Sequence, residues 1–243
     1  MHSRLKISVV TTLLTLGAPA VALELPKPFV ATYAGTPYMF GKLDATITLE
    51  RMGSYLKYTM QTVGTAPFYR NELYDCSVLT LRGERLYVLE YKHTDKKHAD
   101  NNVSARFDWN ARTATVTRAN QEAKRITDLQ WPVWDPVSLQ IGIMTDLLNK
   151  EFTTEKVYRL LERGEVKDRR LRRAGDASIE HAGAPLKVVR VERADRDTEQ
   201  LWFATEYRHI PVRIQLKNIR ADLNSDPARS ARDASTESGT PRC

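Results

Sequence analysis

Short segments in which apolar and polar residues alternate recur along almost the whole chain, and this pattern limits the fold more than any other feature. The clearest segment is LDATITL at residues 43–49, where every second residue is apolar. Because successive side chains of a β-strand point to opposite faces, this period of two predicts a strand with one buried face. Turn residues, such as those at 51–54 and 82–84, join segments of this kind. The sequence therefore predicts an antiparallel meander of about ten strands.

One segment interrupts this pattern, WPVWDPVSLQIGIMTDLLNK at residues 131–150. Asp135 is a favourable N-cap, because its carboxylate can accept hydrogen bonds from the free amides of a first helical turn. Pro136 follows at a position where its missing N–H costs nothing. The apolar residues at three- and four-residue spacing are Val137, Ile141, Met144 and Leu148, and Gln140, Thr145 and Asn149 face the other way. The segment predicts one amphipathic helix, entered through a rigid strap of tryptophan and proline residues.

A sheet of this kind must close on itself or be covered, because its unpaired edges would otherwise pair with other chains. We therefore predict a mainly β fold: a strongly curved antiparallel sheet, either an open or a half barrel, with the helix against its concave face. The helix either fills the core or forms one wall of a ligand cavity. The candidate ligand-binding residues are Trp109, Trp131, Trp134, Ile141, Met144 and Trp202.

Residues 1–22 have the features of a secretory signal peptide. Two basic residues precede an apolar run at residues 7–16, and small residues offer cleavage near Ala20 or Ala22. The run is shorter than the roughly 18–20 residues that a membrane span needs. No cysteine follows it, as a lipoprotein anchor would require. We expect a soluble periplasmic protein without stable membrane insertion.

The remainder of the chain is predicted to form one β-rich domain at residues 23–220, followed by a polar tail at residues 221–243. The tail has no apolar period and is predicted to be disordered. Removing residues 1–22 takes away Arg4 and Lys6 and no acid, so the net charge falls from +7 to +5 (7 − 2). This modest basic excess in an exported protein argues against nucleic-acid binding.

The two cysteines permit two interpretations. Cys76 lies in a strand-like segment, and Cys243 is the last residue of the polar tail. Export allows a disulfide between them, but a buried free thiol is the more common state of a cysteine in a strand. We favour a free Cys76 and keep a Cys76–Cys243 disulfide as the alternative.

Short motifs follow one another in a distinctive order over residues 28–218. They are Ala31-Thr32-Tyr33 followed by a glycine, Phe107-Asp108-Trp109, Asp135-Pro136-Val137-Ser138, Gly175-Asp176, Leu201-Trp202-Phe203-Ala204 and Ile210-Pro211-Val212-Arg213-Ile214. In this order they resemble the bacterial secreted family catalogued as domain of unknown function 3108. The resemblance implies a periplasmic β-rich domain and brings no catalytic residues. A more distant similarity, in architecture only, is to the half-barrel lipoprotein carriers of the same compartment.

Motifs that carry chemistry do not stand out. No nucleophile elbow, P-loop, dinucleotide fingerprint or metalloprotease helix occurs, so we predict neither a catalytic set nor a cofactor. Residues 93–100 (HTDKKHAD) contain imidazoles and carboxylates, but two lysines oppose a cation, and a charged hairpin tip is the better interpretation. In Asp75-Cys76-Ser77, strand alternation turns Cys76 away from its neighbours, and no spacing supplies a base for it. We therefore predict neither a metal site nor thiol catalysis.

The densest basic segment is KDRRLRR at residues 167–173. Its arginines fall on both faces of a predicted strand, which is typical of an exposed hairpin or of a sheet edge that repels other edges. The alternative is a site for phosphate or carboxylate groups of lipid headgroups or cell-wall polymers, which guanidinium groups bind bidentately. The candidate anion- or partner-binding residues are Arg169, Arg170, Arg172 and Arg173.

Three functions are compatible with these features. The leading hypothesis is a periplasmic binding or carrier-like protein for an apolar or amphipathic, lipid-like ligand between the helix and the sheet. The alternative is a structural or interaction protein of the envelope that uses a basic hairpin or a sheet edge. The third is an envelope hydrolase whose site the sequence does not reveal, in which Asp75, His93 or Asp135 would converge in one pocket.

Overall fold

The structure, a computed structural model, describes residues 23–37, 41–217, 219–227 and 241–243. Within these ranges the chain forms fourteen strands, one α-helix and one short 3₁₀ helix. The strands are β1 (Phe29–Pro37), β2 (Lys42–Met52), β3 (Tyr55–Ala66), β4 (Tyr69–Arg82), β5 (Arg85–Asp95), β6 (Val103–Asp108), β7 (Thr113–Arg118), β8 (Lys124–Ile126), β9 (Glu155–Glu162), β10 (Glu165–His181), β11 (Ala184–Arg193), β12 (Arg196–Ala204), β13 (Ile210–Leu216) and β14 (Ile219–Leu223). The helices are η1 (Ala99–Asn101) and α1 (Ser138–Leu148).

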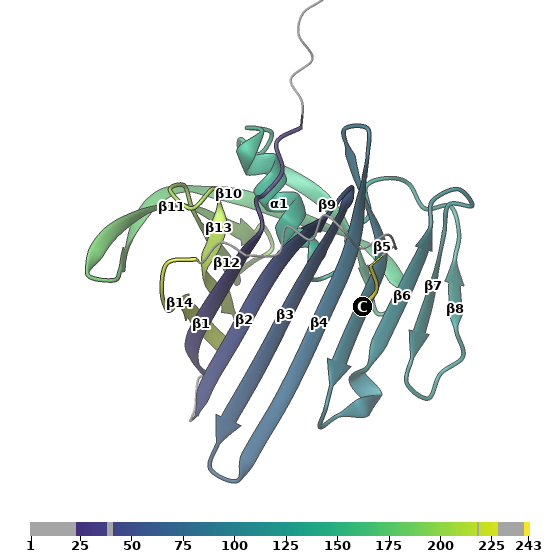
Figure 1. Cartoon of the computed structure of the whole chain (residues 1–243), viewed down its shortest axis with the longest axis horizontal. Helices are drawn as coiled ribbons and strands as arrows, with labels where there is room; N and C mark the ends of the chain where they lie inside the picture. The colour runs from purple at the N-terminus through teal and green to yellow at the C-terminus, as the bar shows by residue number, and fades with distance from the viewer. Residues whose placement is uncertain (1–22, 38–40, 218, 228–240) are drawn as a thin grey trace, which may run out of the picture.

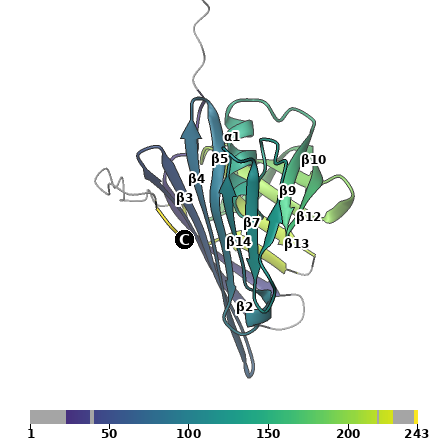
Figure 2. The same cartoon turned by 90° about the vertical axis from the view of Figure 1, so that its right-hand side faces the viewer.

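The fourteen described strands form one antiparallel sheet in the order β8-β7-β6-β5-β4-β3-β2-β1-β14-β13-β12-β11-β10-β9. The sheet curves back on itself, so that β9–β13 lie behind β1–β5, with α1 between the two halves near one end (Figures 1 and 2). Tyr33 of β1 ties the halves together, since its hydroxyl donates a hydrogen bond to the carbonyl of Pro211 in β13 at 2.7 Å. The predicted class, a mainly β curved meander with one helix on its concave face, is confirmed.

The sheet has more strands than the ten predicted. β8 lies in a polar segment, residues 119–129, whose composition is typical of a loop. β14 pairs with β1 on one side and β13 on the other, and its residues 221–223 belong to the predicted tail. β8 has only three residues and lacks apolar alternation. β14 does alternate, with Ile219, Ala221 and Leu223 separated by polar residues, but it is short and adjoins the polar tail. The ordered domain therefore extends beyond residue 220.

Two further predictions concern the ends of the chain. The predicted signal peptide, residues 1–22, and residues 228–240 of the predicted tail lie outside the described residues. In the part of the chain that is described, no helix combines the length and the apolar character that crossing a bilayer requires.

The sheet stays open, and its two edge strands are β8 and β9. The segment that connects them contains the strap and α1, and this segment covers part of the β9 edge. Trp134 forms a parallel bridge with Leu160 of β9, through the hydrogen bonds Trp134 N–H to Arg159 O at 2.9 Å and Leu161 N–H to Trp134 O at 2.8 Å. The strap thus satisfies backbone groups that an open edge would leave unpaired.

The regular helix begins at Ser138, two residues after the start predicted at Pro136, and Asp135 caps the turn that leads into it. Asp135 accepts hydrogen bonds from the amides of Val137 and Ser138, both at 2.9 Å. Its carbonyl accepts the amide of Leu139 at 3.1 Å. These bonds satisfy N–H groups that have no partner inside the helix, as N-capping requires.

The predicted amphipathic pattern of α1 is wrong on one face. Gln140 and Thr145 were expected to face solvent, and both are buried. The Tyr58 hydroxyl donates a hydrogen bond to Gln140 Oε1 at 2.7 Å, and the Thr145 hydroxyl donates to the carbonyl of Ile141 at 2.8 Å. Because both halves of the sheet pack against the helix, its polar residues lie in the interior and find partners there.

Candidate functional site

The predicted ligand site next to α1 is filled by protein side chains. Ile141 and Met144 have no exposed surface, and neither has Ile143 between them. The indole of Trp134 lies directly on the helix backbone, because a Cβ placed on Gly142 would come within 2.8 Å of its ring carbons. A ligand-sized space beside these residues would leave part of their surface accessible to a water-sized molecule. Trp134, Ile141 and Met144 therefore meet as parts of a packed core.

The other candidate tryptophans lie elsewhere. Trp109 and Trp131 both pack on Tyr87 of β5, at ring-centroid distances of 5.3 and 6.0 Å. Their indole N–H groups donate to the carbonyls of Val88 and Leu86, at 2.6 and 2.7 Å. Trp202 is buried on β12, where the guanidinium of Arg213 lies 5.6 Å from its ring. The structure therefore divides the six predicted residues among three separate places.

The basic segment lies on β10, which is not an end strand of the sheet. Residues 167–170 pair with β9 alone, and pairing with β11 begins at Leu171. All four arginines are engaged by acids of the same chain. The ion pairs are Arg169–Glu162, Arg170–Glu155 at 3.2 Å, Arg172–Glu192 and Arg173–Asp176 at 2.6 Å. Glu192 is buried, with a side chain only 7% exposed, so Arg172 compensates a carboxylate that water does not reach. These pairs neutralise much of the charge that an anionic partner would need.

Two of the three residues named for a hydrolase site do meet. Asp75 and His93 are cross-strand neighbours on β4 and β5, and His93 Nδ1 lies 2.8 Å from Asp75 Oδ1. The Tyr91 hydroxyl donates to the same carboxylate oxygen at 3.2 Å. The hydrogen bond to Asp75 raises the pKa of His93 above its usual value, and partial burial opposes this rise. Burial, together with the negative charge of Asp75, raises the pKa of the Tyr91 hydroxyl.

The third residue, Asp135, binds Ser77, which is the next residue after Asp75 on the same face of β4. Its Oδ2 accepts hydrogen bonds from the hydroxyls of Ser77 in β4 at 2.7 Å and Ser138 in α1 at 2.6 Å. Burial raises the pKa of Asp135, and the hydrogen bonds from Ser138, Ser77 and the amide of Val137 oppose the rise. The carboxylate thus joins the start of the helix to the middle of the sheet.

This arrangement does not form an accessible nucleophilic site. Ser77 donates its hydroxyl proton to Asp135, but it has no exposed surface, so no substrate reaches its oxygen. Asp95, from the segment considered for a metal, instead accepts the amides of Lys97 and His98 and shapes a turn. Among the described residues, no three His, Cys, Asp or Glu side chains are placed to hold a metal ion.

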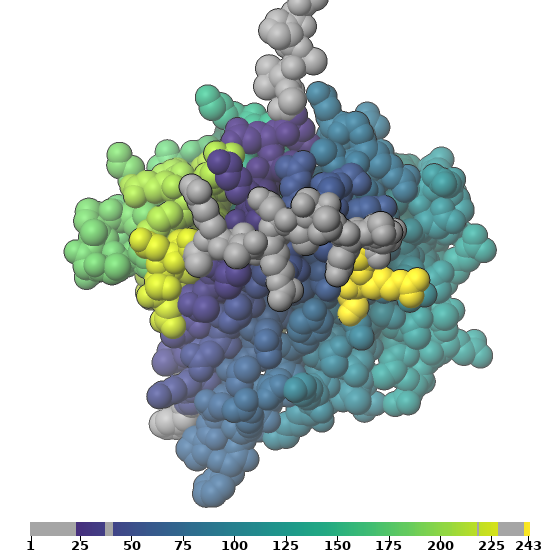
Figure 3. All heavy atoms as spheres, in the orientation of Figure 1, coloured from purple at the N-terminus to yellow at the C-terminus, as the bar shows by residue number. Residues whose placement is uncertain are grey.

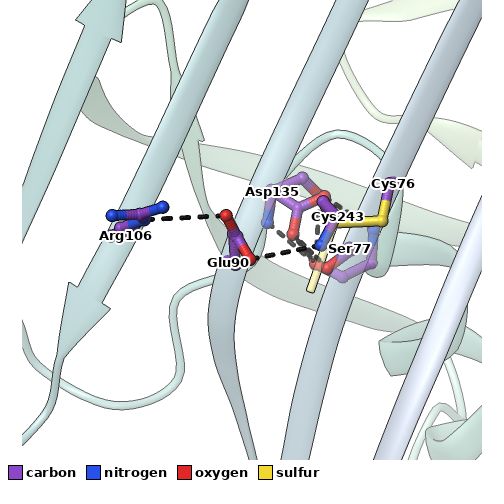
Figure 4. Close-up of a disulfide and its surroundings, with 7 residues drawn as sticks. Cys76, Ser77, Glu90, Arg106, Asp135 and Cys243 are labelled. Carbon is purple, nitrogen blue, oxygen red and sulfur yellow. Dashed lines mark hydrogen bonds and ion pairs between the residues drawn. A yellow bond between two sulfur atoms is a disulfide. The ribbon is translucent and has the colours of Figure 1, made fainter. Parts of the chain in front are cut away.

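The cysteines form the less favoured of the two states that the sequence allows. Cys76 and Cys243 are joined by a disulfide, with Cα atoms 5.6 Å apart (Figure 4). Cys76 lies on the outer face of β4, opposite to Asp75 and Ser77, as strand alternation predicts. The amide of Cys243 also donates to Glu90 Oε2 at 3.2 Å. The bond fixes the end of the chain on the outer face of the sheet, where the yellow C-terminal residues lie in Figure 3.

An open pocket of about 480 Å³ lies beside this disulfide. Its lining residues are Glu90, Lys92, Ser104, Arg106, Thr115, Thr117, Arg242 and Cys243. Sequence reasoning missed it, because the residues come from three strands and the chain terminus. The alternating polar positions on β5, β6 and β7 signalled only solvent exposure, and the pocket needs the disulfide to bring in its last two residues.

No protein-family model matches the chain, and no curated protein matches it in sequence. The fold is similar to the crystal structure of a beta-barrel-like protein of domain of unknown function DUF1849 from Brucella abortus, with a TM-score of 0.52. The similarity covers 87% of this chain and 100% of that one, at 10% sequence identity. At that identity the likeness shows the fold alone. The chain is thus a β-barrel-like protein, and its membership of the domain of unknown function 3108 family stays a prediction.

Proposed function

We propose that this chain is a non-catalytic interaction protein of the bacterial periplasm, which binds its partners or ligands on the outer face of the sheet. The observation that carries the proposal is the burial of α1. Ile141, Ile143 and Met144 have no exposed surface, so the place where a carrier of this architecture would hold an apolar ligand is occupied by the protein itself. A lipid would have to displace the helix, and the hydrogen bonds of Asp135 and Gln140 to the sheet oppose that displacement.

Two features support the periplasm as the compartment. The sequence begins with a predicted signal peptide, and the Cys76–Cys243 disulfide is of a kind that persists in oxidising compartments. The outer face is the proposed surface for binding, because it carries the pocket beside the disulfide.

Ligand content distinguishes this proposal from a carrier. The mature protein would be purified under native conditions, extracted with organic solvent and examined by mass spectrometry. We expect lipid well below one equivalent per chain, and no rise in the thermal midpoint of unfolding when indole is added. One equivalent of a defined lipid, recovered from repeated preparations, would contradict the proposal.

A matched variant shows that the assay can detect an interior site. Trp134→Ala removes the indole that covers Gly142 and opens a dry apolar space, and engineered spaces of this kind bind small aromatic molecules. We expect indole to raise the thermal midpoint of this variant and not that of the wild-type protein. An equal rise in both proteins would mean that the wild-type interior already holds accessible space.

A further inference from the structure

The pocket beside the disulfide has a regular floor. Lys92 of β5 pairs with Ser104 of β6, which pairs with Thr117 of β7. The adjacent row consists of Glu90, Arg106 and Thr115 on the same three strands. Paired residues of neighbouring strands project on the same face with their Cβ atoms about 5 Å apart. The six side chains therefore form two parallel rows on the outer face.

The wall of the pocket is the end of the chain. The disulfide to Cys76 and the amide hydrogen bond to Glu90 hold Cys243 above β4 and β5 (Figure 4). Arg242 precedes it and lines the same pocket. The wall thus brings a cation to a floor that already contains two, Lys92 and Arg106.

Charge in the pocket is unbalanced. The only side-chain carboxylate of the lining, that of Glu90, is 17% exposed and has both oxygens engaged, by Arg106 at 3.6 Å and by the amide of Cys243 at 3.2 Å. Arg106 is 74% exposed, and its pair with Glu90 is long, so its terminal nitrogens remain available. Within the described part of the chain, Lys92 and Arg242 form no ion pair. Three cations therefore face two carboxylates, those of Glu90 and of the chain terminus at Cys243, which leaves an excess of one positive charge.

The floor also offers hydroxyl groups. Ser104, Thr115 and Thr117 form no side-chain hydrogen bond with any described residue, so each hydroxyl is free to donate and to accept. A volume of about 480 Å³ is in the range of small-molecule sites. Cations at one end and hydroxyls along the floor match a molecule that carries an anionic group on a polyhydroxylated body.

We propose that this pocket binds a saccharide bearing a phosphate or carboxylate group, with Arg106, Arg242 and Lys92 around the anion. Ser104, Thr115 and Thr117 then bond the sugar hydroxyls. Guanidinium groups suit this role, since they form two parallel hydrogen bonds with either anion. The inference rests on the proposed function, for which it names the ligand class. It also assigns a role to the disulfide, because this covalent bond, with the weaker hydrogen bond to Glu90, keeps Arg242 at the site.

The test is calorimetry of the mature, disulfide-closed protein at low ionic strength. The probes are glucose 6-phosphate, glucuronate, glucose and inorganic phosphate. We expect glucose 6-phosphate, glucuronate or both to bind, and the one that binds more tightly identifies the anion. Glucose is expected not to bind, and inorganic phosphate to bind more weakly than the phosphorylated sugar. Inorganic phosphate binding as tightly as glucose 6-phosphate would overturn the saccharide assignment, and so would failure of both anionic sugars to bind at millimolar concentration.

Variants locate the site. Arg106→Ala and Arg242→Ala should each weaken binding at least tenfold, because each removes a charged hydrogen bond to the anion. Cys243→Ser should cause the same loss as Arg242→Ala, while Lys187→Ala, an exposed lysine on β11, should change nothing. Arg242→Ala keeps the disulfide, so its result does not depend on folding of the cysteine variant. Unchanged affinity in both arginine variants would overturn the proposal, and it would leave the lipid-content test of the proposed function unaffected.

Discussion

Asp135 makes local interactions that the sequence predicts and a long-range interaction that only the folded structure shows. Its role as an N-cap is local, since the amides that it accepts lie two and three residues away, and the sequence predicts it. Its bond to Ser77 is not local, since the two residues are 58 positions apart. The partner of a buried side chain depends on strand register, and alternation in one sequence shows which face a residue occupies but not what lies opposite. For the same reason the sequence offers the Asp75–His93 contact only as a condition of the hydrolase hypothesis, and the register of β4 and β5 decides it.

His93 makes the stability of the protein depend on pH. Its pKa is raised in the folded state, mainly by the hydrogen bond to Asp75, so the folded protein binds the proton more tightly than the unfolded chain. The resulting stabilisation is complete below the ordinary value of 6.5 and is lost as the pH rises through the raised pKa. We expect the free energy of unfolding in urea to fall over this range in the wild-type protein and to fall less in His93→Gln.

The control for this measurement is His98→Gln, which changes an exposed histidine near the end of the same hairpin. Its curve of stability against pH should coincide with that of the wild-type protein. If His93→Gln gave the same pH dependence as the wild-type protein, the contact with Asp75 would not be the source of the effect.

At the scale of elements, the sequence predicts the start of α1 to within two residues and identifies Asp135 as the residue that caps its entry, but it does not predict the surroundings of the helix. Gln140 and Thr145 give the helix a polar face, and polar faces normally meet solvent. Here the second half of the sheet covers that face, which only the whole topology determines. The basic strand β10 is a similar case. From the sequence, its arginines fit either an exposed hairpin or edge or a site for anions. In the structure, β9 and β11 place acids beside them.

Gly142 tests how tightly α1 is packed. A methyl group at this position would lie 2.8 Å from ring carbons of the Trp134 indole. Alanine normally stabilises a helix relative to glycine by about 1 kcal/mol. We expect the opposite for Gly142→Ala, a loss of about 1–3 kcal/mol in the free energy of unfolding, because overpacking of a close-packed core forces its neighbours to shift.

The matched substitution is Gly64→Ala in β3, where an added methyl group meets nothing within 4 Å. It should be neutral or slightly stabilising, since glycine in a strand interior costs conformational entropy. Equal changes in the free energy of unfolding for the two substitutions would show that the Trp134 side chain shifts at little cost. The core beside the helix would then contain space.

At the scale of the molecule, the alternation of apolar residues is enough to predict a curved sheet with a helix inside it. It is not enough to predict fourteen strands, because β8 is a polar strand of three residues and the alternation of β14 spans only five residues next to a polar tail. The outer pocket could not be predicted either. It exists only where β5, β6 and β7 lie in register and the chain terminus returns to β4, a closure over 167 positions that no local pattern records.

That long closure makes the disulfide a determinant of global stability. A crosslink between distant residues mainly restricts the unfolded chain, and native disulfides typically contribute about 2–4 kcal/mol. We expect Cys76→Ala/Cys243→Ala to keep the native near-ultraviolet circular dichroism and to unfold at a lower urea concentration. The free energy of unfolding of the variant should fall more steeply with urea concentration, because the uncrosslinked chain exposes more surface when it unfolds. Wild-type protein treated with a reducing agent should behave like the double variant. Identical midpoints and slopes for the oxidised wild-type protein and the variant would show that the bond does not constrain the unfolded chain. The end of the chain would then be held on the sheet by its other contacts alone.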